Sequence, residues 1–227
     1  MRNEWFEGYI LHVKDFSETS LIAEVFSKEL GKVSLIAKGA KKPKSKFFGA
    51  LQTSNKVRVC LSGRSDLKTL IEVELIASLG SAVLAGSAYS YLYINELIAN
   101  IIPKDTHAED IYHAYDKVMR ESQETKLDEY SLRAFEMELL ELLGYGIHFA
   151  PDEVATNKQS YHYQFAKGFV IMDDNEGFSY DEMVALEEGK LHLVSKAKLK
   201  ELTKEAISHC IEGKEIHSRR IFKKLKS

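Results

Sequence analysis

Apolar and polar residues alternate along five short segments of the first 79 residues, which is the spacing of strands with one buried face. The segments cover residues 5–14, 20–26, 32–38, 57–61 and 71–75. A turn at residues 29–31 joins the second and third segments as a hairpin. Five strands in about 75 residues, without a long helix between them, predict a small closed barrel, and an OB-fold has this size and strand number.

From residue 80 the apolar residues recur at helical spacing instead. Residues 81–102 are apolar on nearly every side, which predicts a helix buried inside a bundle. A membrane-spanning helix is the alternative, and Asn95, Glu96 and Asn100 argue against it. Further helices are predicted at residues 107–122 and 128–143, after a capping box of Ser179 and Glu182, and at residues 195–211 with Ser195 as the N-cap.

One interruption of the helical pattern is a predicted β-hairpin at residues 160–173, with its turn at residues 166–168. The predicted fold class is therefore α+β. An N-terminal five-stranded OB-fold β-barrel at residues 1–79 is followed by an α-helical domain at residues 80–227, which contains the small β-hairpin insertion.

Positive charge is concentrated around the third predicted strand. Residues 28–68 contain eleven basic and two acidic residues, a balance of +9 in a chain whose net charge is −3. Such a field beside aromatic rings favours a polyanion with stackable bases, and a solvated loop that confers solubility is the alternative. Phe47 and Phe48 follow the lysines and either stack on bases or fill the barrel. The candidate contacts with such a polyanion are Lys32, Lys38, Lys41, Lys42, Lys44, Lys46, Arg64 and Phe47.

Catalytic motifs are missing from the sequence. It has no P-loop, no GxGxxG after a strand, no HExxH and no GxSxG. Cys60 and Cys210 form no CxxC pair, so we expect no metal site and no disulfide framework, and a reducing cytoplasm fits best. We therefore expect a binding protein without a cofactor, not an enzyme. Two alternatives stay open: an OB-fold enzyme that processes nucleic acid, such as a nuclease or an RNA-modifying protein, and a protein scaffold that needs no DNA.

Six segments, taken in order, carry a resemblance that spans nearly the whole chain. They are FSETSLIAEVFSKELGKVSLIAKGAKKPKS at residues 16–45, FFGALQ at 47–52, LKTLIEVE at 67–74, YLYINELI at 91–98, LRAFEMELLELLGYG at 132–146 and GKEIHSRRIF at 213–222. In this combination the chain resembles the RecO family of bacterial recombination mediators. The resemblance implies an OB-fold followed by a helical domain, in a DNA repair and recombination protein of the cytoplasm and its nucleoid.

The resemblance also implies a set of partners. These are single- and double-stranded DNA, whose complementary strands the family anneals, and RecR, with which it loads RecA onto DNA covered by single-strand-binding protein (SSB). Many members carry a four-cysteine zinc site after the GYG turn. This chain has no cysteine between Cys60 and Cys210, so it looks like the zinc-free branch, with the predicted hairpin in the same region.

The family binds the acidic, hydrophobic C-terminal tail of SSB through its helical domain. Arg133 is a candidate for the tail carboxylates, with Phe135 and Leu139 on the adjoining turn as its apolar pocket. In the alternative interpretation Phe135 and Leu139 are ordinary core, and Arg133 pairs with Glu129 or Glu136. Another source of cations, or a second DNA contact, is the basic C-terminal segment with Arg219, Arg220, Lys223 and Lys224.

Overall fold

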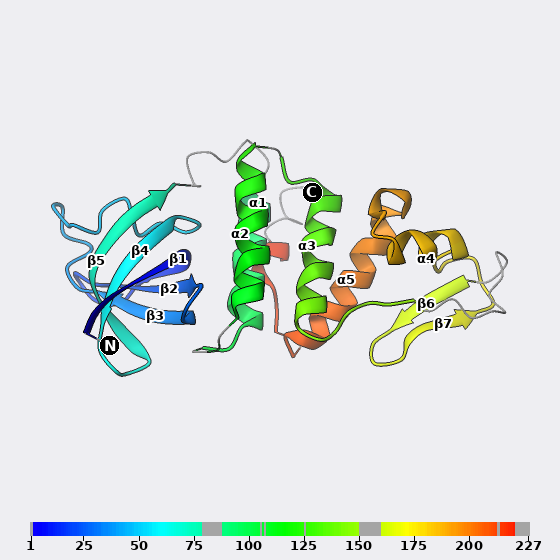
Figure 1. The fold of residues 1–227 in the computed structure, drawn as a ribbon, viewed down its shortest axis with the longest axis horizontal. Helices are drawn as coiled ribbons and strands as arrows, with labels where there is room; N and C mark the ends of the chain where they lie inside the picture. The colour runs from blue at the N-terminus through cyan, green and yellow to red at the C-terminus, as the bar shows by residue number, and fades with distance from the viewer. Residues whose placement is uncertain are drawn as a thin grey trace. The chain divides into compact units, whose positions relative to one another are not determined.

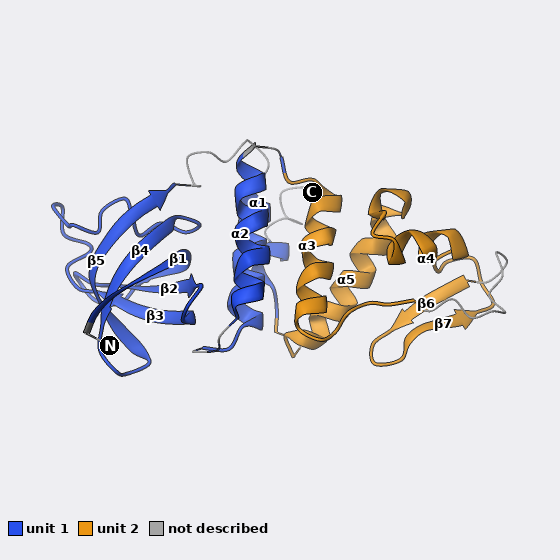
Figure 2. Cartoon of the chain, viewed as in Figure 1, with its two compact units in different colours: residues 1–126, 215–227 blue, residues 127–214 orange. Residues whose placement is uncertain are grey.

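The computed structural model describes residues 2–78, 88–104, 106, 108–124, 126–149, 160–212 and 214–220. The chain forms two compact units (Figure 2). One unit contains residues 1–126 together with 215–227, and the other contains residues 127–214. The expected division at residue 80 separates strands from helices, whereas compactness groups the first two helices with the barrel.

The N-terminal strands close into a five-stranded barrel (Figure 1). The strands are β1 (Arg2–Asp15), β2 (Leu21–Ser27), β3 (Gly31–Ala37), β4 (Lys56–Ser62) and β5 (Leu67–Ala77). Their order around the barrel is β1-β2-β3-β5-β4, and β3 pairs with β5 in parallel while the other pairs are antiparallel. The predicted OB-fold and the α+β class are confirmed.

Alternation places the apolar side of each strand inside the barrel, because successive side chains point to opposite faces. Val57, Val59 and Leu61 of β4 are fully buried, whereas Arg58 between them is exposed. Val25, Leu35 and Leu70 from the other strands belong to the same interior cluster. The hydrophobic pattern of the sequence therefore fixes which side of each strand faces the core.

The first unit also contains two helices that follow the barrel in the chain. They are α1 (Ala88–Ile101) and α2 (Glu109–Glu124), and they run side by side (Figure 1), with Tyr115 of α2 donating a 2.5 Å hydrogen bond to the Asn95 side chain of α1. Ile94, Leu97 and Ile98 of α1 are fully buried, as the helical pattern predicted. The beginning of the predicted helix at 81–102 lies outside the described residues. Among the helices that the structure describes, none is long and apolar enough to cross a membrane.

A buried carboxylate on α2 holds the barrel against this helix pair. Asp116 accepts a 2.7 Å hydrogen bond from the Tyr9 hydroxyl of β1 and a 2.8 Å bond from the Lys56 ammonium of β4. Arg120 lies 2.9 Å from its second oxygen, and Lys56 also pairs with Glu7 at 2.8 Å. Burial alone would raise the pKa of Asp116, but the hydrogen bonds from Lys56 and Tyr9 outweigh it and lower that pKa.

Aromatic rings surround the same contact. Tyr9 packs edge-on against Tyr115 of α2 with ring centroids 5.0 Å apart, and Phe26 of β2 packs against Tyr112 at 5.5 Å. Burial and the neighbouring Asp116 raise the pKa of Tyr9 far above its ordinary value, so its hydroxyl remains a donor. The barrel and the helix pair thus share one apolar and hydrogen-bonded interior.

The second unit is mainly helical (Figure 2). Its elements are α3 (Glu129–Leu142), the hairpin strands β6 (Ser160–Gln164) and β7 (Gly168–Met172), α4 (Tyr180–Glu187), a short 3₁₀ helix η1 (Leu191–Leu193) and α5 (Lys196–Cys210). The predicted hairpin is confirmed, and its turn places Ala166 and Gly168 at positive φ. Gly at that position is favoured because it has no Cβ.

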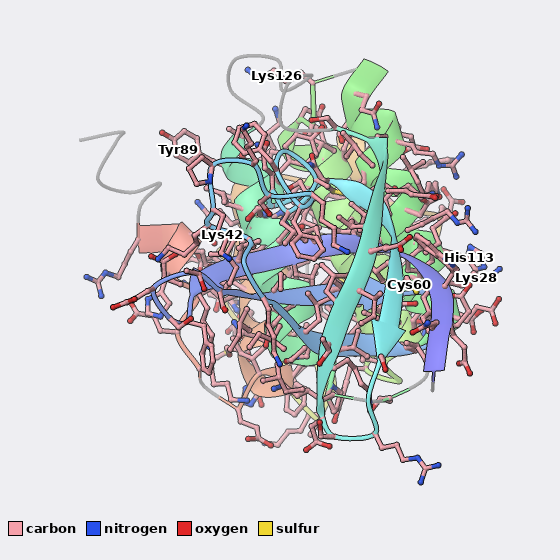
Figure 3. All side chains as sticks on the ribbon, turned by 90° about the vertical axis from the view of Figure 1, so that its left-hand side faces the viewer. Lys28, Lys42, Cys60, Tyr89, His113 and Lys126 are labelled. Atoms are coloured by element: carbon pink, nitrogen blue, oxygen red, sulfur yellow. The ribbon has the colours of Figure 1, made fainter. Side chains whose placement is uncertain are left out.

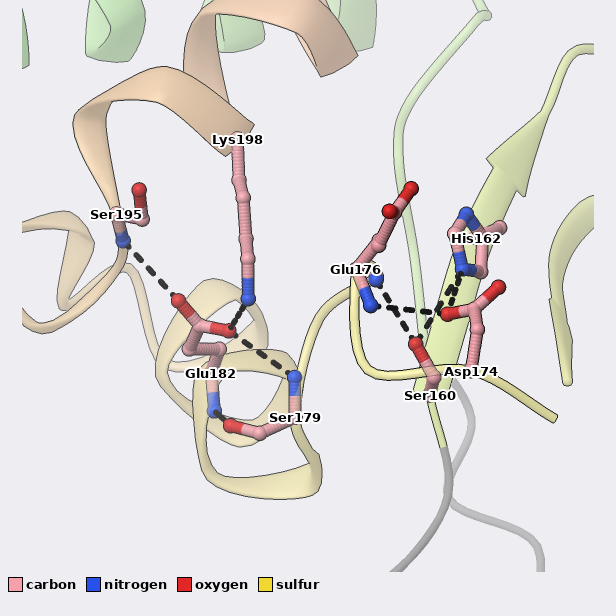
Figure 4. A network of polar contacts seen from close by, with 9 residues as sticks. Ser160, His162, Asp174, Glu176, Ser179, Glu182, Ser195 and Lys198 are labelled. Carbon is pink, nitrogen blue, oxygen red and sulfur yellow. Dashed lines mark hydrogen bonds and ion pairs between the residues drawn. The ribbon is translucent and has the colours of Figure 1, made fainter. Parts of the chain in front are cut away.

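The Glu182 carboxylate accepts hydrogen bonds from the residues that begin α4 and α5 and so connects the two helix N-termini (Figure 4). The predicted capping box is present: the Ser179 hydroxyl accepts from the Glu182 N–H, and the Glu182 carboxylate accepts from the Ser179 N–H. Ser195 is the N-cap of α5, as predicted, but its side chain makes no capping hydrogen bond. Its backbone N–H instead donates to Glu182 at 3.2 Å, and Lys198 pairs with the same carboxylate at 2.6 Å.

We predict that Asp116→Asn lowers the free energy of unfolding by about 3 kcal/mol, because it removes the charge of a buried carboxylate that accepts hydrogen bonds from Tyr9 and from the partly buried Lys56. Urea unfolding of the purified chain measures this change. Glu74→Gln is the matched control, since Glu74 pairs with Arg58 at 3.2 Å on the exposed surface and should contribute less than about 1 kcal/mol. Equal effects of the two substitutions would contradict the role given to Asp116.

The stabilisation by Asp116 should also depend on pH. A carboxyl whose pKa is lower in the folded state stabilises the fold above its unfolded pKa of about 3.9, and this contribution disappears as the pH falls through the folded value. We expect the parent chain to lose more stability below about pH 4 than the Asp116→Asn variant. Unfolding curves at a series of pH values test this, and parallel pH profiles would argue against it.

Candidate nucleic-acid interface

The lysine-rich segment forms the connection between β3 and β4. We call residues 38–46 its outer half and residues 47–55 its inner half, and the inner half is anchored in the barrel. Phe47 is 5% exposed and belongs to the barrel interior, together with Leu51. The buried Asn55 side chain donates to the carbonyls of Gly49 and Ala50 at 2.9 and 3.1 Å. These contacts hold the end of the connection, so its preceding residues project from a fixed base.

Four of the predicted phosphate contacts lie on the outer half of this connection and are exposed: Lys38, Lys42, Lys44 and Lys46. Lys42 is labelled in Figure 3, in which the left-hand side of Figure 1 faces the viewer. Arg64 is also exposed, in the turn between β4 and β5. Like charges at this spacing raise the local positive potential and favour a polyanion. We call Lys38, Lys42, Lys44 and Lys46 the lysine cluster.

Two other predicted contacts have structural partners instead. Lys32 is 8% exposed, and its ammonium donates to the carbonyl of Ala99 on α1, so it is poorly placed to reach a phosphate. Lys41 pairs with Asp15 at 2.8 Å, and its backbone N–H donates to the Thr19 carbonyl at 3.0 Å. The sequence pattern predicted a phosphate contact for every one of these lysines. The tertiary contacts show that Lys32 and Lys41 bind groups of the protein itself.

The prediction of Phe47 as a DNA contact is not supported, because this ring fills the barrel. Phe48, the next residue, is 85% exposed. The two adjacent side chains point in different directions, so the Phe48 ring is accessible to a ligand and the Phe47 ring is not. Phe16, in the turn between β1 and β2, is 56% exposed and was missed as a candidate. An apolar residue inside the polar run Asp-Phe-Ser-Glu-Thr is the signal that could have identified it.

The C-terminal basic residues that the structure describes are engaged with other groups. Arg219 donates a 2.8 Å hydrogen bond to the Tyr93 hydroxyl of α1 and lies 5.2 Å from the centre of that ring. Arg220 pairs with Glu215 at 3.5 Å and remains exposed. Lys223 and Lys224 lie outside the described residues. The segment is therefore anchored to α1, and Arg220 is its better candidate for a second DNA contact.

The predicted receptor for the SSB tail lies in the interior of the second unit. Arg133 is 6% exposed and pairs with the fully buried Glu136 at 3.0 Å, and it donates to the Thr203 hydroxyl of α5 at 3.1 Å. Phe135 and Leu139 are 3% and 0% exposed. The structure therefore favours the alternative interpretation, in which these residues are core and Arg133 serves an internal ion pair.

Other polar groups of the second unit pair locally. His162 lies 2.8 Å from Asp174 and 3.3 Å from the Ser160 hydroxyl (Figure 4), and His148 lies 3.0 Å from Glu141. One nitrogen of His162 makes both contacts, so this is a turn-stabilising group and not the relay of a hydrolase, which uses both ring nitrogens. Among the described residues, no group of three or more His, Cys, Asp or Glu side chains could hold a metal ion.

Comparison with known proteins identifies a family whose models match both parts of the chain. Residues 1–79 match the family model "Recombination protein O N terminal", and residues 86–220 match "Recombination protein O C terminal". The DNA repair protein RecO of Aliivibrio salmonicida is 34% identical over 222 residues, covering 94% of this chain and 93% of that protein. RecO of Vibrio cholerae is 34% identical over 224 residues, and RecO of Pasteurella multocida is 33% identical over 226 residues, each covering at least 92% of both proteins.

Among solved structures, an asparaginyl-tRNA synthetase of Entamoeba histolytica aligns with this chain over 71% of this chain's length and 37% of the synthetase chain's length. Its TM-score is 0.29 at 13% identity, which is too low to support any inference about fold or function.

We predict opposite results for the two adjacent phenylalanines. Phe47→Ala should lower the free energy of unfolding by about 3–5 kcal/mol, because it leaves a cavity in the barrel. Phe48→Ala should change it by less than about 0.5 kcal/mol, since the ring is exposed. Thermal unfolding of both variants makes the comparison, and similar losses would show that the assignment of inner and outer ring is mistaken.

Arg133→Ala should destabilise the second unit by about 3 kcal/mol, because Glu136 would remain buried without its cation. Its matched control is Arg220→Ala, which removes an exposed arginine paired with Glu215 and should contribute less than about 1 kcal/mol. Urea unfolding measures both. An Arg133→Ala variant with parental stability, but weaker binding of an SSB-tail peptide, would restore the receptor interpretation.

Proposed function

The chain belongs to the RecO family of DNA repair proteins, and from this premise we propose that it binds single- and double-stranded DNA and anneals complementary strands. Its activity would serve homologous recombination, in which it assists RecR in loading RecA onto single-stranded DNA covered by SSB. The lysine cluster is the observation that supports the proposed DNA binding. Its four exposed lysines lie on a connection that is anchored in the barrel.

Annealing follows from charge neutralisation. Two strands repel each other because each carries closely spaced phosphates, and a surface that binds both lowers this barrier and raises their local concentration. Base pairing then drives the reaction, so nucleotide hydrolysis is not needed. Lysine supplies a point charge, whereas arginine supplies the planar fork that reads guanine, and the connection between β3 and β4, residues 38–55, contains lysines but no arginine. We therefore propose binding with little sequence preference.

The protein partners are proposed from family membership. RecR and the SSB tail would bind surfaces other than the buried Arg133 pocket, because a receptor must present its cation to the tail carboxylates. The chain contains two cysteines, so it cannot build the four-cysteine zinc site of other members, and we propose no resident cofactor. We propose the cytoplasm and its nucleoid as its location.

An enzyme that processes nucleic acid is the second candidate, and no specific observation favours it. Incubation of labelled DNA with the purified chain, with and without Mg²⁺, distinguishes the two functions. Strand annealing without cleavage supports the mediator, and a cleaved or modified product would replace it with an enzyme.

We predict that replacing all four residues of the lysine cluster by Ala weakens binding to single-stranded DNA and flattens its salt dependence. Each phosphate contact contributes about 0.7 to the slope of log K against log salt for a single strand, so four lost contacts reduce the slope by about 3. Fluorescence anisotropy with a labelled oligonucleotide at several salt concentrations measures the slope.

The matched control removes four exposed lysines from the second unit by the substitutions Lys167→Ala, Lys190→Ala, Lys200→Ala and Lys204→Ala. Both variants change the net charge by −4, so a general charge effect would weaken them equally. A parental slope in the lysine-cluster variant, or equal slopes in the two variants, would remove the lysine cluster from the DNA site.

A further inference from the structure

Two exposed aromatic rings lie on the two connections that Lys41 joins. Phe48 is 85% exposed on the connection between β3 and β4, and Phe16 is 56% exposed in the turn between β1 and β2. Exposing a whole phenylalanine ring to water is unfavourable relative to burying it. Rings left outside while Phe47 fills the core are therefore candidates for contact with a ligand.

Lys41 fastens these two connections together. Its ammonium lies 2.8 Å from the Asp15 carboxylate and donates to the Ser17 carbonyl at 3.4 Å. Its backbone N–H donates to the Thr19 carbonyl at 3.0 Å. Three contacts from one residue keep the turn that carries Phe16 beside Lys41, which lies seven residues before Phe48 on the same connection.

A ligand of this surface must match the positive charge of the lysine cluster as well as the two aromatic rings. The lysine cluster shares its connection with Phe48, and Lys42 immediately follows the residue that fastens the two connections. An apolar protein surface would have to strip water from several ammonium groups without compensation, which is costly. A single nucleic-acid strand supplies phosphates for the cations and base faces for the rings, so it matches both features.

We propose that Phe16 and Phe48 stack on unpaired bases, and that Lys41 is a positioning residue that holds the two rings on one surface. This inference rests on the proposed DNA-binding function and specifies the form of DNA that the surface prefers. Paired bases are already stacked on their neighbours and do not offer their faces, so the rings select single strands whereas the lysine cluster binds either form.

This division of contacts has a consequence for annealing. Two strands held by lysines and rings lose their contacts with the rings when their bases pair. The duplex product is then held by phosphate contacts alone and binds more weakly than the substrates. Stacking thus provides a way to release the product without an energy source.

The experiment compares three labelled probes of equal length: an oligothymidine, an oligomer of abasic sites, and a duplex. The full chain and the substitutions Phe16→Ala, Phe48→Ala, Phe48→Tyr and Leu193→Ala are measured by anisotropy at one low salt concentration. Leu193 is the matched control, because it is 60% exposed and apolar but lies in the second unit. Urea unfolding confirms that each variant keeps the parental fold.

We expect each of Phe16→Ala and Phe48→Ala to weaken oligothymidine binding by roughly 5- to 150-fold, the range for loss of one stacked base. Binding of the abasic oligomer and of the duplex should change less than about twofold. Phe48→Tyr keeps a ring and should bind like the parent, as should Leu193→Ala. A further variant, Lys41→Ala, should show a loss confined to oligothymidine that is smaller than that of either ring.

Other results overturn the proposal in separable ways. Equal weakening on all three probes would mean that the rings act through the shape of the connection and not through bases. Unchanged oligothymidine binding in the ring variants, with a parent that binds all probes, would remove the stacking and leave the proposed function intact. A parent that binds none of the probes at low salt would overturn both.

Discussion

The rest of the first unit depends on one buried carboxylate. Asp116 of α2 accepts hydrogen bonds from Tyr9 and Lys56, which come from two adjacent strands of the barrel. Hydrogen bonds to a charged group contribute about 1.5–3 kcal/mol each, and here they offset the cost of burying the charge. The strand that carries Tyr9 also holds the base of the lysine-rich connection, because Ile10 exchanges backbone hydrogen bonds of 2.7 and 2.9 Å with Ser54 and Asn55.

That chain of contacts explains why a lysine-rich surface segment can be well positioned. Asn55 holds the carbonyls of Gly49 and Ala50, and Phe47 fills the barrel, so the inner half of the connection is part of the core. The outer half presents ammonium groups from this base. Affinity for phosphate comes from charge density, and a fixed base limits the conformational entropy lost on binding. The fold therefore provides a pre-positioned electrostatic surface.

The sequence predicted the architecture well because strands and helices differ in the period of their apolar residues. The barrel, the hairpin with Ala166 and Gly168 at positive φ, and the capping box of Ser179 with Glu182 all depend on such local rules. Side-chain roles were harder to predict, because distant partners decide them. Lys32 meets Ala99, and Arg133 meets Thr203 some 70 residues away. Neither Phe47 nor Phe48 could be assigned to the core from adjacent positions in a turn.

Strand annealing as a function of salt tests the central claim most directly. Complementary labelled oligonucleotides are mixed with the full chain at increasing salt, and the annealing rate is compared with that of the DNA alone. If charge neutralisation by the barrel drives the reaction, the chain accelerates annealing strongly at low salt, and the acceleration disappears as salt screens the phosphates. No acceleration at low salt, or an acceleration that salt does not change, would contradict the account.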